Sequence, residues 1–159
     1  MMRLRLDLQG MRIDLEIKGY HNSNSNNKFD NWCQVSYSFV FPDCINYSKQ
    51  DDEILLSCEV EDLKEMLDDF IDGKITEKIT QGFIEPDFEF VFIPPRNKFE
   101  TGECVCATTG FEMSPPVVEW KIQLWDGGLT DNYFSTTLTM EEIKAFRDYL
   151  SKVIDNNKQ

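Results

Sequence analysis

Histidine is almost absent from this sequence: the only one, His21, lies in a tract of Asn and Ser residues. Serine and cysteine triads use a histidine base, and zinc sites draw on histidines and paired cysteines. Cys104 and Cys106 form the closest cysteine pair, but a single residue separates them and no second pair accompanies them. We therefore expect neither a nucleophilic triad nor a zinc site, and we interpret the cysteines as structural thiols.

Glycine-rich phosphate-binding motifs are also missing. Neither G-x-G-x-x-G nor G-x-x-x-x-G-K-[ST] occurs in the chain, so the backbone cradle that such motifs form around a phosphate is not predicted. Gly127 and Gly128 follow Asp126 between two strand-like runs, which is typical of a hairpin turn. We expect no bound nucleotide and no other cofactor.

Long apolar runs are missing as well. Residues 1–8 alternate charged residues with leucine and lack the continuous apolar stretch of a signal peptide or a membrane span. The five cysteines are an odd number, and a reducing compartment suits free thiols. We expect a cytoplasmic protein that makes no contact with a membrane.

Basic residues are few compared with acidic ones. Sixteen Lys and Arg residues stand against 29 Asp and Glu residues, which gives a formal net charge of −13. Nucleic acid and anionic membranes repel such a surface. The charge favours a basic protein as the partner, or serves solubility alone.

The alternation of apolar and polar residues predicts a single α+β domain over residues 1–159. The chain is 41% hydrophobic and 13% aromatic, enough for a substantial core. Its strand-like segments follow one another in hairpin order, which favours an antiparallel sheet or flattened half-barrel of about eight strands with two packed helices. We expect 43–52 and 96–102 to be loops, and 74–82 to be a charged connector with one helical turn. The predicted strands are 4–8, 13–17, 32–41, 53–58, 88–93, 103–107, 117–125 and 133–138.

Two segments, 59–72 and 139–150, have apolar residues at spacings of three and four, the pattern of an amphipathic helix. Thr139 and Glu142 fit a capping box at the start of the second segment. Each segment follows a strand-like run. The sequence therefore predicts two helices, each packed by one apolar stripe.

The two predicted helices resemble each other. When Leu63 is matched with Ile143, acidic, basic and apolar residues coincide along both helices. This pattern predicts two related halves, 1–73 and 83–154, each made of several strands followed by one helix. Convergence is the alternative, because any two amphipathic helices with acidic first turns look alike.

Three acidic residues, Asp68, Asp69 and Asp72, crowd the end of the first predicted helix. The helix dipole disfavours anions at that end by roughly 0.3–1 kcal/mol each. A functional explanation is an acidic docking surface for a partner. The structural explanation is a solvated charged face whose small cost the core offsets.

A second acidic group surrounds the predicted strand 88–93. Glu85 and Asp87 lie close together in the chain, and strand alternation places Asp87 and Glu89 on one face. Such carboxylates can serve acid–base catalysis, bind a hard divalent cation or contact a basic partner. Trp125, next to the hairpin turn, is the tryptophan we expect to be partly exposed, and tryptophan is favoured at binding hot spots.

Five segments occur in an order found in one known family. They are 13–20 (IDLEIKGY), 30–32 (DNW), 59–70, 83–90 (FIEPDFEF) and 139–150. Together they resemble the WapI-like immunity proteins, which are small cytoplasmic bacterial proteins. Members of this family protect a cell by binding the C-terminal toxin domain of a polymorphic, contact-delivered toxin. Toxin-facing surfaces diverge with the toxin, so the resemblance implies a role without assigning binding residues.

We therefore predict a non-enzymatic immunity protein that neutralises a basic toxin domain, such as a nuclease, by stoichiometric occlusion. Two alternatives stay open: a carboxylate-dependent, metal-binding enzyme that uses Glu85, Asp87 and Glu89, and an acidic adaptor for another basic partner. The sequence predicts no particular oligomeric state. The candidate partner-binding residues are Asp68, Asp69, Asp72, Glu85, Asp87, Glu89 and Trp125.

Overall fold

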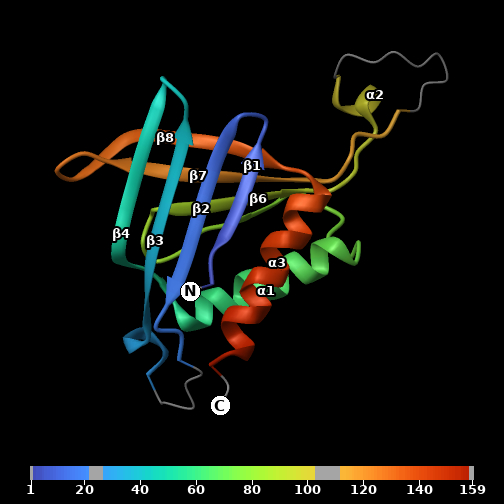
Figure 1. The fold of residues 1–159 in the computed structure, drawn as a ribbon. Helices are drawn as coiled ribbons and strands as arrows, with labels where there is room; N and C mark the ends of the chain where they lie inside the picture. Colours follow the sequence, from blue (N-terminus) through green and yellow to red (C-terminus); the bar gives the residue numbers. More distant parts are fainter. Residues whose placement is uncertain (1, 22–26, 103–111, 158–159) are drawn as a thin grey trace.

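The computed structural model describes residues 2–21, 27–102 and 112–157 (Figure 1). Within these residues the chain forms two four-stranded antiparallel sheets and three α-helices. The first sheet consists of β1 (Leu4–Leu8), β2 (Met11–Lys18), β3 (Trp32–Phe41) and β4 (Ile45–Leu56), in that order. The second sheet consists of β5 (Ile79–Gln81), β6 (Phe88–Ile93), β7 (Val117–Trp125) and β8 (Leu129–Leu138), in that order. The helices are α1 (Ser57–Ile71), α2 (Lys98–Thr101) and α3 (Met140–Asp155), and a 3-10 turn, η1 (Lys28–Asp30), precedes β3.

The predicted α+β class, with antiparallel strands and packed helices, is confirmed. The strands form two open sheets, however, and not one sheet or a half-barrel. Helix α1 lies between β4 and β5 in the chain, and strands pair only with neighbours on their own side of it. The predicted strand 103–107 lies outside the described residues.

The predicted loop 43–52 is wrong from Ile45 onward, because β4 begins there. Among the described strands, β4 is an edge strand that pairs with β3 alone, and most of its first part is exposed. Backbone hydrogen bonds hold such a strand without an apolar face, so its polar sequence resembles a loop. Asp51, with a φ of 47°, lies where the pairing with β3 shifts register.

Four smaller differences concern element type and bounds. The helical turn predicted within 74–82 is wrong, because Ile79–Gln81 form β5 and pair with β6. The predicted loop 96–102 contains the short helix α2. β8 starts at Leu129, before the predicted 133, and α3 continues to Asp155.

One face of the second sheet carries the core. Its aromatic residues contact the first sheet, where the rings of Tyr37 and Phe88 are 4.9 Å apart. They also contact α1 and α3, which lie side by side (Figure 1). The fully buried Trp120 stacks on Phe90 and on Phe146 of α3, each at 5.4 Å between centroids. The first sheet and both long helices therefore cover the same face of the second sheet.

The two long helices start alike. Glu59 of α1 accepts a hydrogen bond from the Leu56 N–H at 2.9 Å, and Glu142 of α3 accepts one from the Thr139 N–H, which confirms the predicted capping box. Both glutamates hold the third helical position. Matching Glu59 with Glu142 shifts the alignment of the two helices by three residues from the one that matches Leu63 with Ile143. A common origin of the two halves stays a prediction.

Candidate partner-binding surface

The second sheet has an outer face that points away from the core. Along β7 the side chains of Val118, Trp120 and Ile122 are fully buried, whereas the residues between them are partly exposed. Strand alternation therefore places those intervening residues on the opposite side of the sheet. We use the term outer face for Glu89 of β6, Glu119, Lys121 and Gln123 of β7, and Tyr133 and Ser135 of β8.

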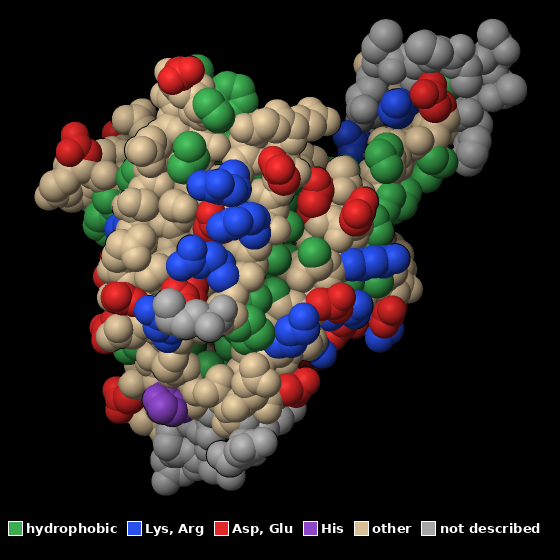
Figure 2. Space-filling view, viewed as in Figure 1, with side chains coloured by type: hydrophobic (Ala, Val, Ile, Leu, Met, Phe, Trp, Pro, Cys, Tyr) green, Lys and Arg blue, Asp and Glu red, His purple; other side chains and the backbone are tan. Residues whose placement is uncertain are grey.

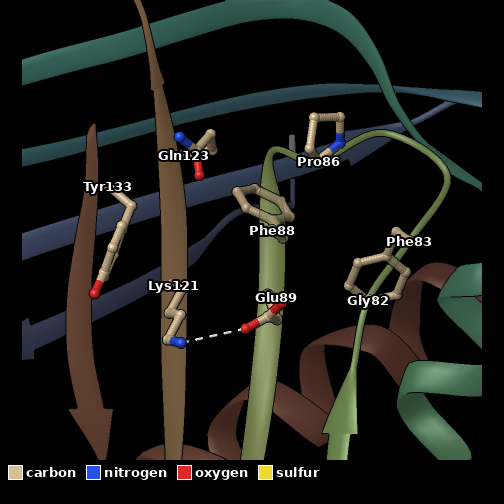
Figure 3. Close-up of a pocket in the computed structure, with 8 residues that line it drawn as sticks. All are labelled: Gly82, Phe83, Pro86, Phe88, Glu89, Lys121, Gln123 and Tyr133. Atoms are coloured by element: carbon tan, nitrogen blue, oxygen red, sulfur yellow. Dashed lines mark ion pairs between the residues drawn. The ribbon is translucent and has the colours of Figure 1, made fainter. Parts of the chain in front are cut away.

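A hollow of about 360 Å³ lies on the outer face (Figure 3). Phe83 and Pro86, from the segment between β5 and β6, line one part of it, and Tyr133 of β8 lines another. Tyr133 is 58% exposed, so its aromatic ring offers a large contact area at the edge of the hollow. The hollow therefore combines apolar surface with a polar floor.

The floor of the hollow contains an ion pair. The Lys121 ammonium lies 3.3 Å from a Glu89 carboxylate oxygen and 5.5 Å from the centre of the Tyr133 ring. The hydrogen bond to Glu89 raises the pKa of Lys121, and the negative charges of Glu89 and Glu119 act in the same direction. Ser135 donates to Glu119 at 3.0 Å. The two carboxylates near Lys121 outnumber it, so this part of the outer face has a net negative charge.

Of the predicted residues around strand β6, only Glu89 lies on the outer face. Glu85 is half-buried in the segment beside the hollow. Asp87 is only 1% exposed and precedes β6, so strand alternation does not apply to it. The prediction that Asp87 and Glu89 share one face is wrong.

Asp87 instead joins the two sheets. Its carboxylate accepts hydrogen bonds from Lys49 of β4 at 2.8 Å and from Tyr37 of β3 at 3.2 Å. Burial and the charge of Asp87 raise the pKa of Tyr37, which keeps the phenol neutral. Burial lowers the pKa of Lys49, but its hydrogen bonds to Asp87 and Asp52 outweigh that effect and raise it.

Trp125 belongs to the same junction between the sheets. The Lys49 ammonium lies 4.2 Å from the centre of the Trp125 ring, and the backbone N–H of Trp125 donates to the Tyr47 hydroxyl at 3.1 Å. Trp125 is partly exposed, as predicted. Sequence analysis missed Lys49, because Asp87 and Trp125 are distant in the chain and become its neighbours only when the sheets pack.

The three aspartates predicted at the end of the first helix lie close to cations. Asp68 accepts from Lys64 at 2.7 Å and from Arg147 of α3 at 2.8 Å, so it links the two long helices. Burial opposes ionisation of Asp68, but these hydrogen bonds outweigh it and lower its pKa. Asp69 and Asp72 lie 3.3 and 3.9 Å from Lys74.

The structure does not bring the two acidic groups together. Glu59, near the start of α1, accepts from the Ile84 N–H at 2.9 Å and holds the segment that contains Glu85. Asp72 follows the last residue of the same helix. A helix of this length separates its two ends by about 20 Å, so Glu85 and Asp72 mark different surfaces.

The exposed face of the first sheet has a different charge pattern. Figure 2 shows basic side chains gathered over β1 and β2. Several are paired with carboxylates of β2, as in the 2.8 Å contact between Arg5 and Asp14. These basic residues are Arg3, Arg5, Arg12 and Lys18. A basic partner meets cations there, which makes the outer face of the second sheet the better candidate for it.

The described residues support neither a metal site nor a membrane-spanning helix. Residues 2–21, 27–102 and 112–157 contain no group of three or more His, Cys, Asp or Glu side chains placed to hold a metal ion. No helix among them combines the length and hydrophobicity needed to cross a bilayer. Cys104 and Cys106 lie outside the described residues.

Comparison with known proteins agrees with the resemblance seen in the sequence. No curated protein matches the chain. A family model, described as the immunity protein WapI-like family, matches residues 3–156. The match includes both sheets and all three described helices. The chain therefore belongs to the WapI-like immunity protein family.

Proposed function

We propose that this protein neutralises a cognate bacterial toxin by binding the C-terminal toxin domain in a stoichiometric complex that covers the toxin's active site. The observation that carries the proposal is the family match over residues 3–156. Occlusion requires no catalytic group in the inhibitor. It requires a rigid surface that is complementary to the toxin.

The outer face of the second sheet is the surface that fits this role best. It presents the exposed Tyr133 beside a hollow, and aromatic residues of this kind often dominate binding energy. It also carries Glu89 and Glu119 with Lys121 as the neighbouring cation. A nuclease toxin has a basic cleft for the phosphate backbone, and an acidic inhibitor is steered toward such a cleft.

The alternative of a carboxylate-dependent enzyme loses its geometric basis. Asp87 is buried against Lys49 at the junction between the sheets, while Glu89 pairs with Lys121 on the outer face. The three carboxylates proposed for catalysis therefore do not converge. The acidic adaptor alternative differs from the proposal only in the identity of the partner.

Co-expression with the C-terminal domain of a candidate toxin, sought in the reading frames next to this gene, tests the function. The wild-type chain should restore growth and co-purify with the toxin domain in equal amounts. If it neither restores growth nor associates with the toxin, the proposed function is wrong.

Two alanine variants then test the surface. Tyr133→Ala should weaken the complex about tenfold or more, since loss of a hot-spot aromatic costs roughly 2 kcal/mol. Phe29→Ala is the matched control, because Phe29 is a similarly exposed aromatic (66%) on η1, away from the outer face. Isothermal titration calorimetry measures both affinities. Equal affinities of the two variants would show that the outer face around Tyr133 is not the interface.

A further inference from the structure

The two sheets have four edge strands, and three of them are poor templates for pairing. β1 is short and carries Arg5 and Asp7, and β5 has only three residues. β4 is interrupted by register shifts and carries several charges. Short length, bulges and charge are the features that protect sheet edges from other strands.

β8 has fewer of these protections, because its register shift against β7 lies near the hairpin turn, between Gln123 and Trp125, and residues 133–138 pair regularly. It is ten residues long, contains no proline or lysine, and carries a single charged residue, Asp131. It is the last strand of the second sheet and pairs with β7 alone among the described strands. The edge of β8 is therefore open to an additional strand.

The pairing pattern identifies the backbone groups at this edge. The Gln123 N–H of β7 donates to the Asp87 carbonyl on the β6 side at 2.9 Å. In an antiparallel sheet successive residues point their backbone groups to opposite neighbours, so Ile122 of β7 points toward β8 and its register partner Phe134. The intervening residues of β8 direct their N–H and C=O groups outward. These residues are Tyr133, Ser135 and Thr137.

The first sheet extends beyond this edge. Along β3, Tyr37 contacts Phe88 of β6, and Phe39 stacks on Phe134 of β8 at 4.8 Å. The next core-facing residue, Phe41, lies about 6–7 Å further along the strand, which exceeds the strand spacing of about 4.8 Å. Phe41 therefore reaches past β8, as the β3–β4 turn does in Figure 1.

The extension leaves apolar surface exposed. Phe41 is 40% exposed, and Ile45, its register partner on β4, is 37% exposed. The preceding inner residue of β3, Phe39, is buried because Phe134 of β8 stacks on it. One more strand beside β8 would cover Phe41 and Ile45 in the same way.

We propose that an extended segment of the toxin domain adds to β8 as a further strand of the second sheet; this inference rests on the function proposed above. Alternate side chains of the segment are apolar and pack on Phe41 and Ile45. The others lie beside Tyr133 and Ser135, where the Glu119 carboxylate, which accepts from Ser135, favours Lys or Arg. Backbone hydrogen bonds supply affinity, and these two rows of side chains supply specificity.

A second copy of this chain does not fit the same place. In a copy added through its own β8, the inner side of that strand is already covered by its own Phe39 stacked on Phe134. The extending Phe41 of the first copy would occupy the same space. The incoming strand must therefore have no sheet packed on its own inner side. An extended toxin segment meets this condition.

Hydrogen–deuterium exchange of the wild-type protein tests the inference without any substitution. In the free protein the amides of Tyr133, Ser135 and Thr137 should exchange fast, and those of Phe134 and Thr136 slowly. Addition of the toxin domain should slow exchange of the first three at least tenfold. If the toxin domain binds and these amides stay fast, the inference is wrong and the proposed function stands.

The exchange experiment separates the remaining outcomes as well. If the wild-type protein binds no toxin domain, the proposed function and this inference both fail. Protection of the three amides that rises with protein concentration in the absence of toxin would show self-association and overturn the choice of partner.

A matched pair of variants provides an independent test. Ser135→Pro removes one outward N–H, and proline is tolerated at an edge position whose N–H faces solvent. Ser135→Ala removes the hydrogen bond to Glu119 and keeps the N–H. Ser135→Pro should bind the toxin domain about tenfold more weakly than Ser135→Ala, because a buried partner carbonyl loses its donor. Equal affinities of two folded variants would contradict the inference.

Discussion

Replacing Asp87 by Asn separates a structural role of this residue from a role in partner binding. The Asp87 carboxylate is 1% exposed and accepts hydrogen bonds from Lys49 and Tyr37, on two strands of the other sheet. The variant keeps the size of the side chain and removes its charge. Lys49, whose side chain is 17% exposed, is then left with Asp52 as its ion-pair partner.

The expected loss follows from this geometry. Breaking a buried ion pair costs about 3–5 kcal/mol. Lys49 retains some exposure and its contact with Asp52, so we expect Asp87→Asn to lower the free energy of unfolding by about 2–3 kcal/mol. For a chain of this size that corresponds to a fall in Tm of roughly 5–10 °C.

Urea unfolding at pH 7, followed by tryptophan fluorescence, measures this loss. A double-mutant cycle with Lys49→Met should give a coupling energy of about 1–3 kcal/mol, because the two side chains interact directly. Toxin affinity of folded Asp87→Asn should equal that of the wild type. Unchanged stability together with a large loss of toxin affinity would refute the structural role and make Asp87 a contact residue.

Two further predictions concern pH. The hydrogen bonds of Asp68 to Lys64 and Arg147 lower its pKa despite burial, so its contribution is present above the ordinary Asp pKa of about 4 and is lost as the pH falls below it. Asp68→Asn should therefore cost about 0.5–1 kcal/mol in urea unfolding at pH 7 and nothing near pH 2, and an equal cost at both pH values would contradict this. Burial raises the pKa of Tyr149 to about 12, so its contribution is complete below pH 10 and declines between pH 10 and 12. Tyr149→Phe, which leaves the Ile17 N–H without its 2.7 Å acceptor, should lose about 1–3 kcal/mol at pH 7 and show a shallower alkaline decline in thermal melts; a decline as steep as in the wild type would count against this role.

The elements that the sequence predicted well are those with one buried face. The predicted bounds of β7 are those observed, because Val118, Trp120 and Ile122 alternate with polar residues. The apolar stripe of α3 is equally plain, and Thr139 marks its start. The strand predicted at 53–58 starts later than β4 does. The first part of β4 has little buried surface, so its sequence does not alternate between apolar and polar residues.

The candidate surface was harder to predict than the fold. Glu89 lies on the outer face, but Asp87, two residues earlier, turns inward to Lys49, since β6 begins only at Phe88. Tyr133 gave no signal in the sequence, because an aromatic residue in a strand usually packs in the core. Its exposure follows from its side of β8, which only the pairing with β7 defines.

Titration of toxin activity tests the central claim most directly. A fixed amount of toxin domain is mixed with increasing amounts of this protein, and residual toxin activity is measured after brief and prolonged incubation. Occlusion predicts that activity falls linearly and reaches zero at one equivalent, with no dependence on incubation time. Activity that is unaffected, or that continues to fall with time at a small fraction of one equivalent, would contradict it.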